Sequence, residues 1–264
     1  MNIFLHELKA NIRSLLIWGV IVVLFTVMGF TKFAAYAENP EMLAVLDQMP
    51  QAILEAFNMN AFNLTTLNGY YGVMFSLYAL MLSIAAAMWG SDIISKEERD
   101  KTVEFSLTLP VTRGQLVTAK VLAALIHCLA LLAITWAATV GSVQSYQPDR
   151  EFYVFLNRSL LPLFLLQLVF LSIGVFLGCA MRRYKQAGSA ALSILLGLYF
   201  LSIISDLNED LDFLRYLTPF KYFDAGLLLR EARIEMTYVW ISLGIAVVGM
   251  AAGYVAYARR DLYI

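Results

Sequence analysis

The chain has 264 residues, of which 60% are hydrophobic and 15% are charged, whereas an average soluble domain has about 45–50% apolar and about 25% charged residues. The formal net charge of -1 provides no basic excess for a nucleic-acid backbone. Two cysteines, Cys128 and Cys179, lie in apolar runs and form neither a disulfide framework nor a metal-binding pattern. These values argue against a soluble enzyme, a nucleic-acid binder and a disordered chain, and they favour a membrane protein.

The segment before the first long apolar run is amphipathic. Its apolar face holds Ile3, Phe4, Leu8, Ile12 and Leu15, and its opposite face holds His6, Lys9 and Arg13. We expect an interface helix along the inner membrane surface, with the cytoplasmic end of the first span as the alternative. A basic start followed by an apolar run and Ala35-Tyr36-Ala37 also resembles a secretory signal, but this run is longer than the about 7–15 residues of a signal core.

Six apolar stretches are long enough to cross a bilayer, which takes about 20 helical residues. They contain only two charged residues, Lys32 and Lys120, both towards span ends, where a long stem can carry the ammonium group to the interface. The predicted spans are residues 14–37, 70–91, 116–141, 160–180, 187–205 and 237–257. The sequence therefore predicts an all-α, polytopic membrane protein with six transmembrane helices, forming a single transmembrane domain over residues 1–264.

Lysine and arginine are distributed unequally between the two sides of these spans. If the N-terminus is inside, twelve of the 19 basic residues lie on the inner side and seven on the outer side. Short cytoplasmic loops are enriched in basic residues, and the short turn Arg182-Arg183-Tyr184-Lys185 is the strongest single indicator. We expect a multi-pass protein of a bacterial cell membrane, with both termini in the cytoplasm.

The inner loop of residues 92–115 carries the most information. Charged residues and an apolar stripe alternate at helical spacing, and the stretch ends in Leu109-Pro110. The charged set is Glu97, Asp100, Lys101 and Glu104, and the apolar set is Val103, Phe105 and Leu107. This pattern predicts a short amphipathic docking helix that Pro110 stops, with Thr112 capping the third span. A solvated connector is the alternative.

The two outer loops, residues 38–69 and 206–236, contain helix-start signals at Asn39-Pro40 and Thr218-Pro219. Leu207, Leu211, Leu214 and Leu217 recur at helical spacing, and an apolar face continues through Phe220, Phe223, Leu227 and Leu228. The stretch after Pro219 is apolar enough to dip into the outer leaflet but too short to span it, so we expect this stretch to pack on the helix bundle.

Two kinds of chemistry are missing from the sequence. There is no G-x-x-x-x-G-K-[ST] motif to hold ATP phosphates. The spans contain no aspartate or glutamate, which ion-coupled carriers usually need.

The polar residues of the spans are mainly serine and threonine, together with Gln167. We assign most of them to helix packing and a minority to a cargo path. An intramembrane enzyme is disfavoured because the spans lack a set of buried acids, bases or metal ligands.

The inner loop resembles the permease subunits of type-2 ABC exporters, which carry Glu-Glu, a short gap, Gly-Thr-x-Glu, leucines, a Pro-Val-(Ser/Thr)-Arg stretch and a lysine in the next helix. The matching residues here are Glu97, Glu98, Thr102, Glu104, Leu107, Pro110, Val111, Thr112, Arg113 and Lys120. Lys101 stands where the family has glycine. The likeness continues over the basic leader, the six spans, the residues 217–223 before the last span, and Arg259-Arg260-Asp261.

This resemblance implies a half-transporter that exports a lipophilic or amphipathic cargo, such as a drug, an antimicrobial peptide or a lipid. Two cytoplasmic ABC ATPase subunits would hold ATP and magnesium, and a second permease, identical or paralogous, would complete the assembly. Glu97, Glu98, Thr102, Glu104 and Leu107 would form a coupling helix that docks on an ATPase. Arg113 and Lys120 would anchor the inner interface, while Leu217, Pro219, Phe220 and Phe223 would form an outer gate. The chain itself would be neither an enzyme nor a metal or nucleic-acid binder.

A non-transporting membrane anchor or sensor with six spans is the alternative function. It would form complexes through the same inner loop but would move no cargo.

Overall fold

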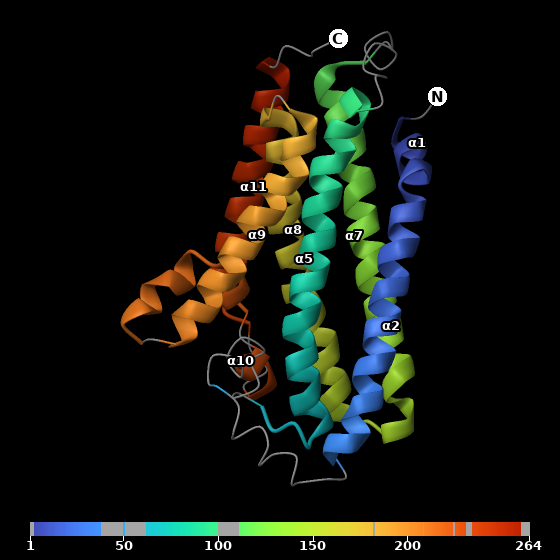
Figure 1. Ribbon diagram of the computed structural model, residues 1–264, viewed down its shortest axis with the longest axis vertical. Helices are drawn as coiled ribbons and strands as arrows, with labels where there is room; N and C mark the ends of the chain where they lie inside the picture. Colours follow the sequence, from blue (N-terminus) through green and yellow to red (C-terminus); the bar gives the residue numbers. More distant parts are fainter. Residues whose placement is uncertain are drawn as a thin grey trace.

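The computed structural model describes residues 3–37, 50, 62–99, 111–181, 183–207, 209–223, 225–230 and 234–259. All regular secondary structure in these ranges is helical, as the sequence predicted. Figure 1 shows long helices bundled side by side, with the start of α1 and the end of α11 at the same end. We call this end, with residues 3–14, 91–99, 111–120 and 254–259, the terminal end. The opposite end, with residues 27–37, 67–75 and 139–159, is the distal end.

Six helices are long and apolar enough to cross a membrane. They are α2 (Ile12–Ala37), α5 (Leu67–Arg99), α7 (Arg113–Val143), α8 (Arg150–Ala180), α9 (Tyr184–Leu207) and α11 (Met236–Arg259). Each contains one predicted span, and most extend beyond it. The helix α8 begins ahead of Leu160 because the Asp149 side chain accepts a hydrogen bond from the Phe152 backbone nitrogen, at 2.8 Å, and caps the extra turns.

The predicted amphipathic segment forms α1 (Ile3–Ala10), which is separated from α2 by Asn11 alone. Helical hydrogen bonds continue through this residue, since the Asn11 nitrogen donates to the Glu7 carbonyl oxygen. In Figure 1 the α1 ribbon leads directly into α2, and α1 packs against α7. Phe4 and Leu8 pack on the core and His6 and Lys9 are exposed, as predicted. Ile12, which was also predicted on the apolar face, is 44% exposed.

The helices α5 and α8 form the centre of the bundle. In the most apolar part of each helix, 67% of α5 and 61% of α8 is buried, against 22% of α2, 22% of α9 and 17% of α11. A β-carbon at Gly90 would lie 2.5 Å from the Leu171 carbonyl oxygen, and one at Gly174 would lie 3.0 Å from the Ser91 nitrogen. Glycine at these two positions therefore allows the α5 and α8 backbones to approach closely.

The segment between α9 and α11 packs on the bundle with its part after Thr218, as the sequence predicted, whereas Phe213, Tyr216 and Leu217 before it are exposed. It contains the 3₁₀ helices η3 (Glu209–Tyr216) and η4 (Pro219–Lys221) and the short α10 (Ala225–Arg230). The helix α10 contacts α5 and α8, with Leu228 buried. Pro219 occupies the first position of η4, after Thr218. The other predicted start, Asn39-Pro40, lies outside the described residues.

The helical spacing of the leucines before Thr218 corresponds to a 3₁₀ helix, not to an α-helix. Leu211, Leu214 and Leu217 recur every three residues, which matches the 3.0 residues per turn of the 3₁₀ form.

Tyr78 illustrates the packing role predicted for polar residues in the spans. Its hydroxyl donates to the Thr26 hydroxyl oxygen, at 2.9 Å, and accepts from the Thr139 hydroxyl, at 3.3 Å, and so links α2, α5 and α7.

Candidate functional site

The segment that resembles a coupling helix joins the terminal ends of α5 and α7. The helix α5 continues through Arg99, so Glu97 and Glu98 lie in its last turns and not in a separate loop helix. The predicted docking residues Thr102, Glu104 and Leu107 lie outside the described residues. The segment ends at Thr112, whose hydroxyl accepts from the Gln115 nitrogen, at 3.2 Å, while its own nitrogen donates to the Gln115 side chain, at 2.9 Å. This capping box starts α7 where the sequence predicted a cap.

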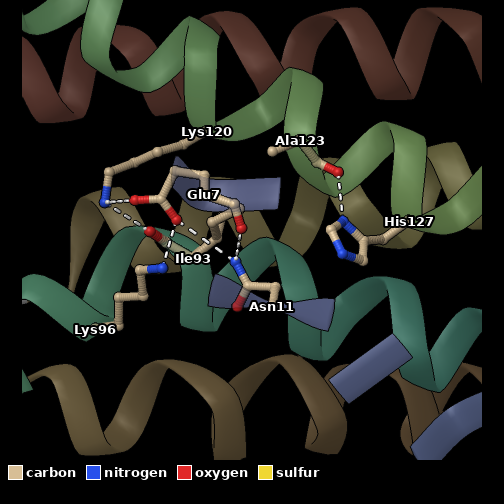
Figure 2. A network of polar contacts seen from close by, with 7 residues as sticks. All are labelled: Glu7, Asn11, Ile93, Lys96, Lys120, Ala123 and His127. Carbon is tan, nitrogen blue, oxygen red and sulfur yellow. Dashed lines mark hydrogen bonds and ion pairs between the residues drawn. The ribbon is translucent and has the colours of Figure 1, made fainter. Parts of the chain in front are cut away.

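A buried ionic cluster lies directly beside this segment, between α1, α5 and α7. Figure 2 shows the side chains of Glu7, Lys96 and Lys120 pointing towards one another. The Lys120 ammonium donates to the Ile93 carbonyl oxygen, at 2.8 Å, and lies 3.7 Å from a Glu7 carboxylate oxygen. The other oxygen of the Glu7 carboxylate forms an ion pair with Lys96. Asn11 donates to the Glu7 carbonyl oxygen, at 2.9 Å.

The expectation that Lys120 reaches the membrane interface is wrong. Lys120 is 1% exposed and Glu7 is 2% exposed, so both charges are removed from solvent and lipid alike. The ammonium stays inside because a carboxylate and a main-chain carbonyl oxygen replace the water that it loses. By contrast, Lys32, the other lysine in the spans, is exposed as predicted.

Glu7 is the residue of this cluster that the sequence analysis overlooked. It occupies the apolar face of α1, next to Leu8 and three positions after Phe4. An acidic residue on the apolar face of an amphipathic helix is rare unless it has a buried partner. This unusual position could have indicated from the sequence that Glu7 has a buried partner. It does not indicate which basic residue that partner is.

Arg113 connects the other end of the segment to the last helix. Its guanidinium donates to the Tyr257 and Ala258 carbonyl oxygens of α11, both at 3.4 Å. These are the carbonyl groups near a helix C-terminus, where a positive charge is favourable. The α5 end of the segment is therefore tied to α1 and α7 through the ionic cluster, and its α7 end is tied to α11.

The helix α7 also carries His127, which lies seven residues, about two turns, after Lys120 and is drawn beside the ionic cluster in Figure 2. Its Nδ1 atom is 2.7 Å from the Ala123 carbonyl oxygen of its own helix. Its ring lies 5.6 Å from that of Trp89, whose indole nitrogen donates to the Ser14 hydroxyl oxygen, at 2.8 Å. These contacts extend the junction of α2, α5 and α7 towards the middle of the bundle.

A cavity of about 620 Å³ opens on the other side of α5, between α2 and α9. Its polar lining comes from four serines together with Asp92 and Lys185, and its apolar lining from Met88, Trp89 and Leu192. The serines are Ser14, Ser91, Ser95 and Ser189. This size is in the range of small-molecule sites, about 300–1,000 Å³.

The residues predicted to form an outer gate fall into two groups. Pro219 and Phe223 are buried, and the Phe220 ring packs 5.1 Å from Phe170 of α8 and 5.3 Å from Tyr199 of α9. Leu217 is 58% exposed and therefore contributes little to this packing. The structure brings three of the four candidates together against the bundle.

Comparisons with known proteins agree with this architecture. The family model described as ABC-2 family transporter protein matches residues 1–262. No curated protein matches the chain. Since the family match covers nearly the whole chain and six apolar helices can cross a membrane, this chain belongs to the ABC-2 family of transporter proteins, as a multi-pass membrane permease.

Proposed function

We propose that this permease is the membrane-spanning subunit of an ABC exporter that moves a lipophilic or amphipathic cargo outward. The proposal rests on one observation, that both ends of the coupling segment are attached to other helices. Lys96 and Lys120 link its α5 end to α1 and α7, and Arg113 links its α7 end to α11. A force applied to the segment would therefore move four helices together.

In this mechanism the segment docks on a cytoplasmic ABC ATPase. Glu97, Glu98, Thr102, Glu104 and Leu107 provide the docking surface, with mixed charge on one side and an apolar stripe on the other. Two ATPase subunits supply ATP and magnesium, and a second permease, identical or paralogous, faces this one. Closure of the ATPases displaces the segment, and the helices tied to it switch the access of the cargo site from the inner to the outer side.

Membrane orientation follows from the same assignment. The terminal end carries the coupling segment, so it faces the cytoplasm of a bacterial cell, with both termini inside. The outer gate lies near the end of α9 that is remote from the terminal end. It consists of the packed aromatic rings of Phe220 and Phe223, together with Pro219 and Leu217. No aspartate or glutamate occurs in the spans predicted from the sequence, which supports an energy source on a partner subunit.

The test begins with a search for an ABC ATPase gene next to this one, followed by reconstitution of the two proteins. We expect the two proteins to purify together and vesicles to show ATP-dependent flux of a fluorescent amphipathic probe. Leu107→Asp should retain membrane insertion and lose the coupling of ATP hydrolysis to flux, because an acid replaces the apolar contact. Leu5→Asp, at a 50% exposed leucine of α1, is the matched control and should remain coupled.

Three results would contradict parts of this proposal. Failure of the ATPase to bind the wild-type chain removes the exporter assignment. Binding without ATP-dependent flux favours the alternative of a membrane anchor or sensor. Wild-type coupling in Leu107→Asp removes Leu107 from the docking surface.

A further inference from the structure

The cavity between α2, α5 and α9 has features of a binding site that packing does not explain. Ser95 lines it and is 6% exposed, yet its hydroxyl oxygen has no hydrogen-bond partner among the residues that the structure describes. A buried polar atom without a partner is costly, by about 1–3 kcal/mol, so native proteins rarely retain one without a use for it. A ligand in the cavity would provide the missing partner.

Charges of both signs line the same cavity from different helices. Asp92 comes from α5, and Lys185 comes from the start of α9. Ser14, on α2, accepts a hydrogen bond from Trp89, which orients its hydroxyl at the cavity wall. A ligand that fits these groups carries a positive and a negative charge close together and has several oxygen atoms.

An apolar stripe on α5 leads away from the charged part of the cavity. Met88 is 44% exposed, and Ile84, Met81 and Leu77 are only partly buried. These residues and Asp92 follow one another at spacings of three and four, so they share one face of the helix. The face is therefore apolar along its length and ends in a carboxylate at the cavity.

We propose that this cavity binds the zwitterionic headgroup of a glycerophospholipid from the leaflet at the terminal end of the bundle. The ammonium group pairs with Asp92, the phosphate pairs with Lys185 and accepts from Ser95, and the acyl chains follow Met88, Ile84 and Met81. The role of this lipid as cargo rests on the transport function proposed above, while its binding does not.

The test uses the full-length chain with Trp89 as its single tryptophan, made by Trp18→Phe, Trp136→Phe and Trp240→Phe. Phosphatidylethanolamine brominated near the glycerol end of its acyl chains is titrated into the detergent-solubilised protein, and quenching of Trp89 fluorescence is measured. We expect saturable quenching, at a concentration about tenfold lower than for phosphatidylglycerol brominated at the same positions. That ratio corresponds to one hydrogen bond between charged groups.

Two serines of α5 provide a matched pair of variants. Within the described part of the chain, Ser95 and Ser83 are both buried without a hydrogen-bond partner, and of the two Ser95 lines the cavity. Ser95→Ala should weaken phosphatidylethanolamine binding about tenfold or more, the effect of one hydrogen bond to a charged group, and Ser83→Ala should leave it unchanged. Asp92→Asn should remove the preference over phosphatidylglycerol, and Lys185→Gln should weaken the binding of both lipids.

Equal quenching by the two lipids overturns the proposal, as do equal effects of Ser95→Ala and Ser83→Ala. Tighter binding of a brominated dialkylammonium lipid, unaffected by Lys185→Gln, assigns the cavity to cationic amphiphiles and also overturns it. The measurement requires neither ATP nor an ATPase. Its failure therefore refutes the lipid site alone, whereas loss of ATP-dependent flux with normal quenching refutes the transport function alone.

Discussion

At the terminal end of the bundle, α1, α5 and α7 meet around the buried Glu7 carboxylate and two ammonium groups. At the distal end, α2, α5 and η2 (Gln144–Tyr146) meet around aromatic rings and tyrosine hydroxyls. At the distal end the Tyr70 hydroxyl donates to the Gly29 carbonyl oxygen, at 2.6 Å, and the Tyr146 hydroxyl donates to the Phe30 carbonyl oxygen, at 2.8 Å. The Phe33 ring lies between both tyrosines, with centroid distances of 5.3 and 5.1 Å.

The two ends differ in the free energy that it costs to separate their helices during a conformational change. A neutral hydroxyl that loses its carbonyl partner costs about 1–3 kcal/mol, but a buried charge that loses its partner costs several kcal/mol. The helices at the terminal end must therefore move as a unit or exchange charge partners, while those at the distal end can separate at lower cost. This arrangement suits a protein that receives force at the terminal end and opens at the distal end.

Removal of the buried carboxylate should have the largest effect. In Glu7→Ala, Lys120 stays buried and loses its contact with the Glu7 carboxylate, so we expect a loss of about 3–5 kcal/mol in the free energy of unfolding. Thermal unfolding in detergent measures the loss, and limited proteolysis of the N-terminus tests whether α1 detaches. His6→Ala, at an exposed neighbour on α1, is the control.

The combination Glu7→Gln with Lys120→Met separates the charges from the packing. If charge pairing is the main interaction, the double variant should be more stable than Glu7→Ala, because it no longer buries the Lys120 ammonium without the Glu7 carboxylate. Lys96 loses its ion pair with Glu7 in both variants and does not affect the comparison. Equal stability of the two variants would indicate that α1 is held by its apolar contacts.

The close contact of Gly174 in α8 with Ala87 and Ser91 of α5 lies beside the terminal end, and its loss should loosen the centre of the bundle. In Gly174→Ala the new β-carbon would meet the backbone of Ala87 and Ser91, so we expect a loss of about 1–3 kcal/mol. Gly197→Ala on α9 has nothing within 4 Å of the new carbon and should be neutral or slightly stabilising. A melting temperature equal for both variants would contradict the close approach of α5 and α8.

The two ends also differ in how far the sequence alone could predict them. Hydropathy locates all six membrane helices because lipid forces the backbone to satisfy its own hydrogen bonds. The period of 3.6 residues places Phe4 and Leu8 on the buried face of α1, and the Thr112 cap follows from local chemistry. Each of these features depends on residues close together in the sequence.

Features that depend on tertiary contacts could not be predicted, because they join residues that lie far apart in the sequence. Glu7 pairs with Lys96 and Lys120 from two other helices, and no local pattern connects them. The cavity at Ser95 exists only because α2 and α9 flank α5. The continuation of α5 through Arg99 was also missed, because charged residues mark the end of a membrane span and not the end of a helix.

A single hydroxyl at the distal end should matter less than either the carboxylate or the glycine. The Tyr71 hydroxyl lies 2.6 Å from the Ser159 hydroxyl and links α5 to α8. Tyr71→Phe should cost about 1 kcal/mol, and a double-mutant cycle with Ser159→Ala should give a coupling of about 0.6 kcal/mol, the average for hydrogen bonds within membranes. A coupling as large as the loss in Glu7→Ala would remove the distinction between the two ends.

The smallest effect is expected outside the spans, where Tyr222 packs on the bundle. Its hydroxyl donates to the Tyr216 carbonyl oxygen, at 2.6 Å, and its ring stacks on Tyr238, with centroids 5.2 Å apart. Burial, with a smaller contribution from Tyr238, raises the pKa of Tyr222 above its usual value of about 10. The folded state therefore favours the neutral phenol, so this contribution to stability is present below about pH 10 and is lost as the pH rises through the folded-state pKa.

Melting temperatures of the wild type and Tyr222→Phe between about pH 8 and 11 test this contribution. The wild type should be more stable at the lower pH, by up to about 1 kcal/mol, because it has one more hydrogen bond. Its advantage should shrink as the phenol ionises, since the phenolate cannot donate to the Tyr216 carbonyl oxygen and is unfavourable when buried. The phenylalanine variant has no proton to lose at this position and isolates the effect from all other titrating groups. An advantage that grows with pH would mean that the ionised form is the one favoured in the folded state, which contradicts the burial of this hydroxyl against η3.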